Sequence, residues 1–426
     1  MRTYGQPQGP GVKNSPRTCN HGRTCASTGV RTHARALVLP AVLPVVLPVV
    51  LLALPALARA QDASDPLGPV LVLHAAAALE RDSNVLRAPD AVSDEIGVLS
   101  AGLRLDKRYS LQRLTLQAQA SRFRFRDFSN LDYSTLSYDG AWNFQFTPTL
   151  RGVLSADRRQ YRDITNASIA SGDITRRTER RDLAEVTLLG RGGWRTLAGL
   201  EQTRSRSDDP RALQASPTVS SVHVGGGYEF PAGALLTAQV RRGDGDYGGA
   251  ASGIEFRETE PSVSLRWPAT ARTALDARIA WLDRSHHQEP ARDFQGLVAN
   301  GTARWTYSPR TSVEAGLARD LGSYEFSGGG RIRGWRLYLA PAWKPSEKTA
   351  LRFRHTMERR DWLVVSSASP DLGREDRTRW NALTFEWTPR RLVEFNASVR
   401  QERRQSTLAG AGFRANVVAV GARLNF

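Results

Sequence analysis

The chain has 426 residues, of which 24% are charged, and its formal net charge is +17. A mean hydropathy of -0.40 excludes a bundle of membrane-spanning helices, because such a bundle needs several long apolar runs and this chain has one. No linker-like break divides the chain after residue 60, so residues 61–426 are expected to form one large unit.

Residues 1–60 are expected to be an N-terminal extension and a cleavable signal peptide. The apolar run Ala36 to Leu57 follows basic residues and leads into the small-residue site Ala58-Arg59-Ala60, which predicts cleavage after Ala60. A permanent membrane anchor is the alternative, but four prolines interrupt the run. Both cysteines, Cys19 and Cys25, lie in this segment, so the mature chain can form no disulfide and no thiolate zinc site.

From Gln61 onward, apolar and polar residues alternate with period two, which is typical of strands whose two faces meet different surroundings. The alternating segments have about the length that a tilted strand needs to cross a bilayer. Examples are Leu99 to Leu105, Leu114 to Ala120, Leu136 to Phe146, Ala234 to Val240, Val263 to Trp267, Leu351 to Met357 and Val393 to Val399.

Short breaks between the strands recur every 36 to 44 residues, which is the spacing of a repeated hairpin. Proline presets a turn and cannot donate to a ladder, so these breaks are predicted to be tight turns at one rim. They are Asp106-Lys107-Arg108, Thr147-Pro148-Thr149, Gly190 to Gly193, Pro231-Ala232-Gly233, Pro268-Ala269-Thr270, Ser308-Pro309-Arg310, Pro345-Ser346-Glu347 and Thr388-Pro389-Arg390. Longer polar segments are expected at the other rim: Arg81 to Asp90, Arg126 to Leu131, Asp163 to Arg176, Ser205 to Ser216, Gly243 to Gly253, Ser285 to Pro290, Ser327 to Gly330, Ser366 to Asp376 and Gln405 to Gly410.

Eight tight turns account for sixteen strands, and the flanking segments Val70 to Arg81 and Phe413 to Phe426 raise the count to eighteen. The predicted fold class is an all-β, transmembrane, antiparallel up-and-down barrel of about 18 strands (16 to 18), with short periplasmic turns and longer external loops. The last strand is expected to pair with the first. A soluble propeller also repeats near forty residues, but it needs four shorter strands per repeat.

Aromatic residues gather just before most of the tight turns and are predicted to form a girdle at the periplasmic interface. The candidates are Phe146, Phe230, Trp267, Trp305, Trp343 and Trp387. The chain ends on Phe426, which is expected at the same rim as a C-terminal signal for the barrel-insertion machinery.

If the apolar face of each strand meets lipid, the other face lines a polar lumen with an excess of arginine. The predicted lumen-facing arginines are Arg104, Arg113, Arg151, Arg241, Arg266, Arg278, Arg304, Arg336, Arg352, Arg354 and Arg400. The same rule places Asp139, Glu185, Glu229, Asp276, Glu314, Glu386 and Glu394 inside. Arginines in a pore favour anions, but they also brace the wall when they pair with carboxylates, and both interpretations stay open.

No pattern in the chain indicates catalysis, and we expect no enzyme activity, no cofactor and no metal. The histidines His74, His223, His286, His287 and His355 fit no metal-ligand spacing, and no hydrolase signature is present. The segment Gly243-Asp244-Gly245-Asp246 lacks the ligand spacing of a calcium loop and is expected to be a flexible external loop.

The sequence resembles the EpsL-type outer-membrane proteins of exopolysaccharide biosynthesis, most closely over residues 75 to 160. The residues that carry the resemblance are Arg81-Asp82-Ser83-Asn84-Val85-Leu86-Arg87, Leu99-Ser100-Ala101-Gly102-Leu103-Arg104-Leu105-Asp106, Tyr133 through Trp142-Asn143-Phe144, and Thr147-Pro148. The resemblance implies a β-barrel porin associated with assembly or export of a secreted polysaccharide, and it supplies no catalytic residues.

These observations predict a barrel of the Gram-negative outer membrane that conducts a growing exopolysaccharide through its arginine-rich lumen, gated by loops such as Asp163 to Arg176. The expected partners are outer-membrane lipid, the insertion machinery, the secreted polysaccharide and periplasmic polysaccharide-export components, with no nucleic acid. The alternative is a general diffusion porin for small anionic or sugar solutes, which would use the same lumen.

Overall fold

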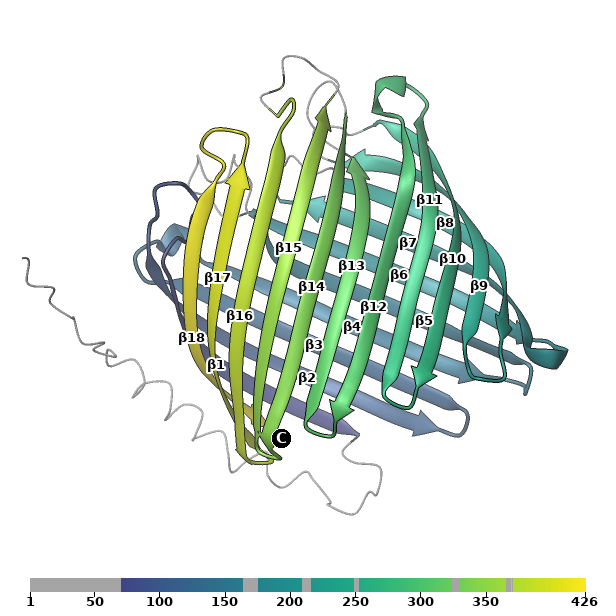
Figure 1. The fold of residues 1–426 in the computed structure, drawn as a ribbon, viewed down its shortest axis with the longest axis horizontal. Coiled ribbons are helices and arrows are strands. Elements are labelled where there is room, and N and C mark those ends of the chain that lie inside the picture. The colour runs from purple at the N-terminus through teal and green to yellow at the C-terminus, as the bar shows by residue number, and fades with distance from the viewer. Residues whose placement is uncertain are drawn as a thin grey trace, which may run out of the picture. The chain divides into compact units, whose positions relative to one another are not determined.

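The computed structural model describes residues 70–163, 175–208, 216–248, 253–323, 330–364, 369 and 371–426. The predicted N-terminal extension and signal peptide lie outside these residues. The described part of the chain forms one sheet of eighteen strands (Figure 1). Among these residues, no helix is long and apolar enough to cross a membrane.

The strands follow one another along the chain with the bounds β1 Leu71–Asp82, β2 Asp94–Tyr109, β3 Gln112–Phe125, β4 Tyr133–Gln145, β5 Leu150–Asp163, β6 Thr175–Leu189, β7 Trp194–Ser207, β8 Ser216–Glu229, β9 Leu235–Gly248, β10 Glu255–Thr270, β11 Thr273–His286, β12 Phe294–Ser308, β13 Thr311–Ser323, β14 Gly330–Ser346, β15 Thr349–Val364, β16 Glu375–Arg390, β17 Val393–Ser406 and β18 Phe413–Asn425. Three short 3-10 turns, η1 Ser129–Leu131, η2 Arg191–Gly193 and η4 Pro290–Arg292, lie between them.

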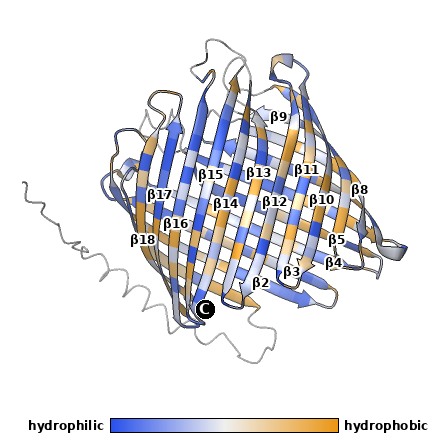
Figure 2. Ribbon diagram, in the orientation of Figure 1, coloured by the Kyte–Doolittle hydropathy of each residue, from blue (hydrophilic) through white to orange (hydrophobic). Residues whose placement is uncertain are grey.

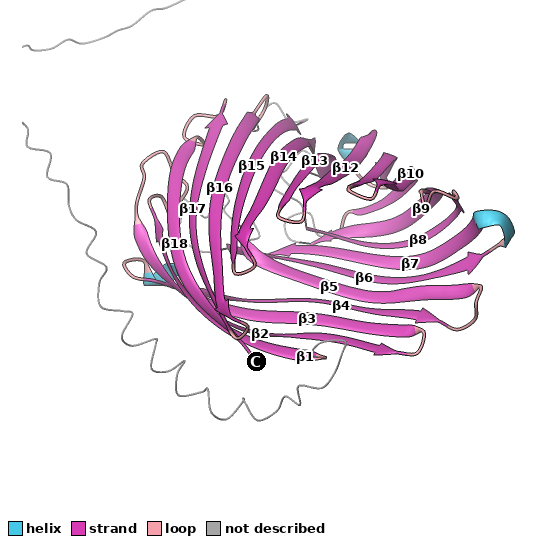
Figure 3. Cartoon of the chain, turned by 60° about the horizontal axis from the view of Figure 1, so that its bottom comes forward, coloured by secondary structure: helices cyan, strands magenta, loops and turns pink. Residues whose placement is uncertain are grey.

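Each strand pairs antiparallel with its neighbours in sequence, and the ring closes where β1 pairs with β18 (Figure 3). The closing register runs from His74 opposite Asn425 to Asp82 opposite Val417. Phe426 continues it by exchanging two backbone hydrogen bonds with Leu73, at 3.0 and 2.7 Å. The prediction of an eighteen-stranded up-and-down barrel that closes between its first and last strands is confirmed.

Alternation along most strands separates an exposed, largely apolar outer face from a polar inner face, and in β18 the exposure alternates in the same way although the inner face is mostly small and apolar. In β18, Val418 is 49% exposed whereas its neighbour Val417 is 4% exposed. Hydrophobic and hydrophilic residues alternate in this way along the visible strands in Figure 2. A closed barrel satisfies all its backbone hydrogen bonds and can present such an apolar face only to lipid, so the chain is an outer-membrane β-barrel.

Four of the eight predicted tight turns lie where they were expected, and four are wrong by a few residues. The segments Thr147-Pro148-Thr149, Gly190 to Gly193, Pro231-Ala232-Gly233 and Ser308-Pro309-Arg310 connect strands as predicted. Asp106-Lys107-Arg108 instead continues β2, because Asp106 pairs with Arg113 of β3 at 2.6 Å and the chain reverses at residues 110 and 111.

The other three corrections concern proline. Strands β10, β14 and β16 continue past Pro268, Pro345 and Pro389. The turn that follows each strand begins two or three residues after its proline. In each strand the pairing register shifts across the proline, so the proline lies in a bulge rather than in the turn. A bulge tolerates a residue that cannot donate to the ladder, which explains the displacement.

The segment Gly243 to Asp246, expected to be a flexible loop, belongs to strand β9. Gly245 lies opposite Phe256 of β10, and a Cβ atom on Gly245 would come within 2.5 Å of the Phe256 ring. Glycine therefore lets the aromatic ring pack on the strand, and pairing extends further than the glycine content suggested. Residues 164–174 of the predicted gating loop Asp163 to Arg176 lie outside the described residues.

Candidate functional site

The polar inner face of the barrel is the candidate site. All eleven predicted lumen arginines lie on the face opposite to the exposed apolar side chains; Arg352 and Arg354, for example, flank the outward Phe353. The acidic residues assigned by the same rule share this face. The structure therefore brings these charges together on one continuous inner wall.

Seven of the eleven arginines form ion pairs with carboxylates, and most of these pairs join neighbouring strands. Five simple pairs are Arg113–Asp106 at 2.6 Å, Arg266–Asp276 at 3.4 Å, Arg304–Glu314 at 2.7 Å, Arg336–Glu358 at 3.1 Å and Arg352–Glu386 at 2.9 Å. Such pairs cancel charge and hold adjacent strands together, so bracing of the wall accounts for most of the predicted set.

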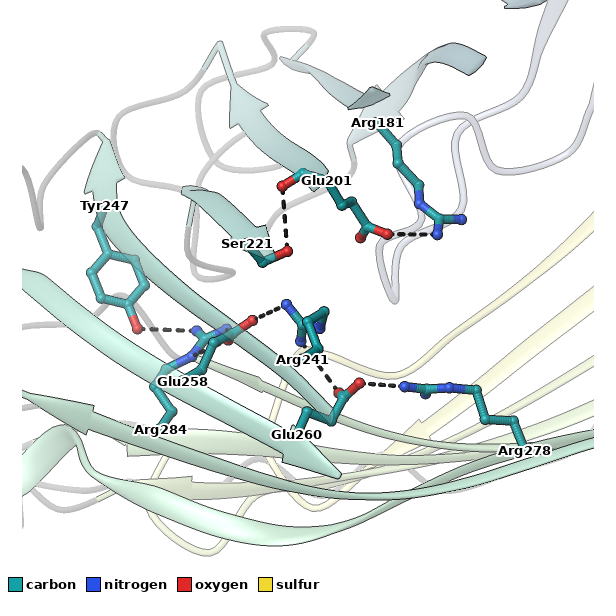
Figure 4. A network of polar contacts seen from close by, with 9 residues as sticks. All are labelled: Arg181, Glu201, Ser221, Arg241, Tyr247, Glu258, Glu260, Arg278 and Arg284. Carbon is teal, nitrogen blue, oxygen red and sulfur yellow. Dashed lines mark hydrogen bonds and ion pairs between the residues drawn. The ribbon is translucent and has the colours of Figure 1, made fainter. Parts of the chain in front are cut away.

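The other two paired arginines belong to a buried network on β9, β10 and β11 (Figure 4). Glu258, 3% exposed, accepts from Arg241 at 2.5 Å and from Arg284 at 2.7 Å. Glu260 pairs with Arg241 at 3.4 Å and with Arg278. Three guanidinium groups thus meet two carboxylates.

Tyr247 and Phe256 complete the surroundings of Arg284. Arg284 donates to the Tyr247 hydroxyl at 3.2 Å, and its guanidinium lies 4.1 Å from the centre of the Phe256 ring. Sequence reasoning missed Glu258 and Glu260 because it began strand β10 at Val263. The even-numbered alternation continues back to Phe256 and would have included them.

A polar cavity of about 810 Å³ opens into the inner wall between strands β4–β7 and β9–β12. Its charged lining consists of Arg151, Arg195, Arg266, Arg278, Glu185 and Asp276. Asparagine, glutamine and threonine side chains fill much of the remaining lining. Arg151 and the pair Arg266 and Arg278, which follows it by more than a hundred residues in sequence, therefore meet in one cavity.

Arg195, which the sequence did not single out, is the most constrained of these arginines. Its side chain is 9% exposed, and its Nη2 atom donates to Glu229. Its Nε atom is buried and has no hydrogen-bond partner within the described residues. Arg151 forms no ion pair with any carboxylate of the described residues. A buried donor without a partner costs free energy, and the guanidinium of Arg151, which also lines the cavity, is the group with which a carboxylate or phosphate there could pair.

The remaining predicted arginines, Arg104, Arg354 and Arg400, do not line this cavity. None of them forms an ion pair with a carboxylate of the described residues, and Arg354 lies 4.1 Å from the centre of the Tyr338 ring. Together with Arg151 they are the members of the predicted set that pair with no carboxylate of the described residues.

At the loop rim, the connection between β1 and β2 folds onto the inner wall. Val85 and Leu131 are buried against Ile96 and Phe125, and Phe123 stacks on Tyr133 with ring centres 4.3 Å apart. These apolar contacts hold the connection against strands β2 and β3.

Ion pairs hold the segments at this rim. In the β1–β2 connection, Arg87 pairs with Asp82 at 2.7 Å and with Glu402 at 3.0 Å. In the β15–β16 connection, burial would lower the pKa of Arg374, but the hydrogen bonds that Arg374 donates to Asp376 and Asp371 outweigh it and the pKa is raised. Arg374 therefore stays charged and fixes the start of β16.

The aromatic candidates lie at the short-turn rim with exposed side chains. Phe146, Phe230, Trp267, Trp305, Trp343 and Trp387 are between 40% and 58% exposed. Phe426 ends the chain at this rim, near the C label of Figure 1.

Histidines of the described residues contribute to packing rather than to a metal site. A hydrogen bond of 2.9 Å joins the Nε2 atom of His286 to the Tyr247 hydroxyl, and the Nδ1 atom of His286 contacts the Asp293 carboxylate. The Nε2 atom of His223 lies 3.0 Å from the Glu185 carboxylate. Within the described ranges, no group of three or more His, Cys, Asp or Glu residues could hold a metal ion.

No family model and no curated protein matches the sequence. Similar solved structures include Pseudomonas aeruginosa OccK1 (OpdK), with 11% identity and a TM-score of 0.48, covering 84% of this chain and 99% of that chain. OccK2 (OpdF) of the same organism, solved in complex with glucuronate, has 13% identity and a TM-score of 0.47, covering 84% of this chain and 98% of that chain. The P. aeruginosa outer membrane protein OpdK itself also matches with 10% identity, a TM-score of 0.47 and coverage of 84% and 99%.

Proposed function

We propose that this barrel is a diffusion channel for small anionic solutes, with polar sugars as a secondary class. The observation that carries the proposal is the polar cavity of about 810 Å³, whose lining includes Arg195 and the guanidinium of Arg151, which forms no ion pair with a carboxylate of the described residues. A volume of several hundred Å³ suits a small molecule.

Arginine chemistry supports the choice of an anion. A guanidinium binds a carboxylate through two parallel hydrogen bonds, and charges without local partners raise the concentration of anions inside a channel. The amide side chains of Asn143, Gln145 and Gln239 in the same cavity can donate to and accept from sugar hydroxyls.

The test is the permeability of the purified barrel in lipid bilayers. In a potassium chloride gradient, the reversal potential is expected to show anion selectivity, and reconstituted liposomes should admit gluconate faster than glucose. In the R151Q/R195Q variant, the anion preference should fall and the gluconate rate should approach the glucose rate.

A matched control removes two lumen charges away from the cavity, as R304Q/R352Q. This variant loses the same formal charge but leaves the cavity lining intact, so it should keep the gluconate preference. An equal loss in both variants would show that the cavity does not select the solute.

The export of exopolysaccharide stays a prediction that rests on the family resemblance. If the protein exports the polymer, a strain that lacks the protein should retain the polymer inside the cell. Normal secretion by that strain would reject export, and it would leave the diffusion channel untouched.

A further inference from the structure

Three arginines lie side by side on the outer face of the barrel near the loop rim. Arg379 of β16 lies directly opposite Arg403 of β17, which lies directly opposite Arg414 of β18. All three are exposed and share their face with the outward Leu383, Val399 and Val418. We refer to Arg379, Arg403 and Arg414 as the arginine ladder.

The arginine ladder is unfavourable by itself. Side chains directly opposite across two strands have Cβ atoms about 4.5–5.5 Å apart, and like charges in such pairs destabilise the sheet. Within the described ranges, none of the three guanidinium groups has an ion pair or a hydrogen bond.

Next to the ladder, the chain does neutralise its outward arginines. Asp361 pairs with Arg333 at 2.8 Å and with Arg359 at 3.0 Å, and Glu375 pairs with Arg359 at 3.0 Å and with Arg377. The outward row next to the ladder, Arg359 and Arg377, is therefore neutralised by the carboxylates of the row beyond it. The ladder has no such carboxylate, so its charge is open to an external anion.

The position of the ladder relative to the apolar belt of the barrel indicates where in the membrane that anion would lie. Moving toward the short turns, the next outward row is Asn381, Gln401 and Asn416, and the row after it is the apolar Leu383, Val399 and Val418. The ladder thus lies about 13 Å along the strand beyond the start of the apolar belt, at the depth of lipid head groups on the side of the longer loops.

The same arrangement recurs on the opposite part of the ring. Arg158 of β5, Arg180 of β6 and Arg204 of β7 are also outward and directly opposite one another. Here Asp182 pairs with Arg180 at 2.8 Å. Recurrence at the same rim indicates a common anionic environment rather than one local irregularity.

We propose that the arginine ladder binds the phosphate groups of the phosphorylated glycolipid of the outer leaflet, lipopolysaccharide. A phosphate held between neighbouring guanidinium groups accepts several charge-assisted hydrogen bonds and removes their mutual repulsion. The short-turn rim is periplasmic, so the ladder faces the outer leaflet, where the anionic lipid is a phosphorylated glycolipid.

The test uses the full purified chain in neutral detergent and measures its affinity for bisphosphorylated lipid A by native mass spectrometry. Wild type should bind this lipid A more tightly than lipid A from which both phosphates have been removed. The R379Q/R403Q/R414Q variant should bind it roughly 100-fold more weakly, because each basic side chain contributes about tenfold or less at an anionic surface. Without lipid A, the same variant should melt at a higher temperature than wild type, because the like-charge repulsion is gone.

The matched control is R81Q/R122Q/R242Q. It removes three exposed outward arginines, none of which lies opposite another arginine on a neighbouring strand. It should keep most of the affinity. An equal loss in the control, equal binding of phosphate-free lipid A, or equal binding of phosphatidylglycerol would each overturn the proposal. Inorganic phosphate that binds as tightly as lipid A would overturn the assignment to a lipid.

Discussion

At the residue scale, Glu258 shows how charge is tolerated inside the barrel. Two guanidinium groups, from Arg241 and Arg284, are within hydrogen-bond distance of its carboxylate, and the carboxylate is almost fully buried. Removing such charges from water costs several kcal/mol per ion, and only mutual pairing offsets this cost. Loss of one partner therefore has a larger effect than loss of an exposed pair.

The substitution Glu258→Ala is expected to destabilise the barrel by about 3–5 kcal/mol, since it leaves the buried guanidinium of Arg284 without its carboxylate and Arg241 with Glu260 alone. Urea unfolding of the reconstituted protein, followed by tryptophan fluorescence, measures the change. Asp244→Ala is the control, because it breaks the exposed pair with Arg257 and should cost at most about 1 kcal/mol. Similar losses in the two variants would contradict the role of burial.

At the element scale, the pairing of β9 with β10 depends on a glycine opposite an aromatic ring. A Cβ atom on Gly245 would lie 2.5 Å from the Phe256 ring and 2.8 Å from the backbone oxygen of Thr218. The ring packs with Tyr247 and Val219 in a small buried cluster beside the Glu258 network. Strand pairing and the charged network therefore depend on the same packing.

Gly245→Ala is expected to lower stability by about 1–3 kcal/mol through overpacking against this ring and backbone. Gly322→Ala provides the comparison, because a Cβ atom there meets nothing within 4 Å. The comparison variant should be neutral or slightly more stable, since alanine reduces the freedom of the unfolded chain. Equal melting temperatures for both variants would argue against the close contact.

At the scale of the whole molecule, closure between β1 and β18 removes both free edges of the sheet. Free edges leave unpaired backbone groups, which a bilayer cannot satisfy. The terminal Phe426 takes part in this closure through its two hydrogen bonds with Leu73. Its aromatic ring is also the predicted signal for insertion.

Phe426→Ala keeps the backbone hydrogen bonds but removes the ring, so the folded barrel should be nearly as stable as wild type. Its assembly in cells is expected to fall several-fold if the insertion machinery recognises the terminal aromatic residue. The fraction of heat-modifiable protein in outer-membrane preparations measures assembly. Phe395→Ala, at another exposed outward aromatic, is the control and should assemble normally.

Some features of the fold were within reach of the sequence and others were not. Alternation located nearly every strand, because facing lipid on one side and polar groups on the other imposes period two on neighbouring residues. The ends of strands were less predictable: Pro268, Pro345 and Pro389 were assigned to turns but lie in bulges. A bulge depends on the partner strand, which local sequence does not specify.

The sequence by itself determined the barrel, its eighteen strands, the closing pair and the polarity of each face, since all of these follow from a local period and a repeated hairpin. Only the tertiary structure decided which inward arginines are neutralised, that Arg151, Arg195 and Arg278 share one cavity, and that Arg379, Arg403 and Arg414 stand in one row. The physical reason is register. Alternation tells which face a side chain occupies, but the stagger of each strand pair decides which side chains on that face meet.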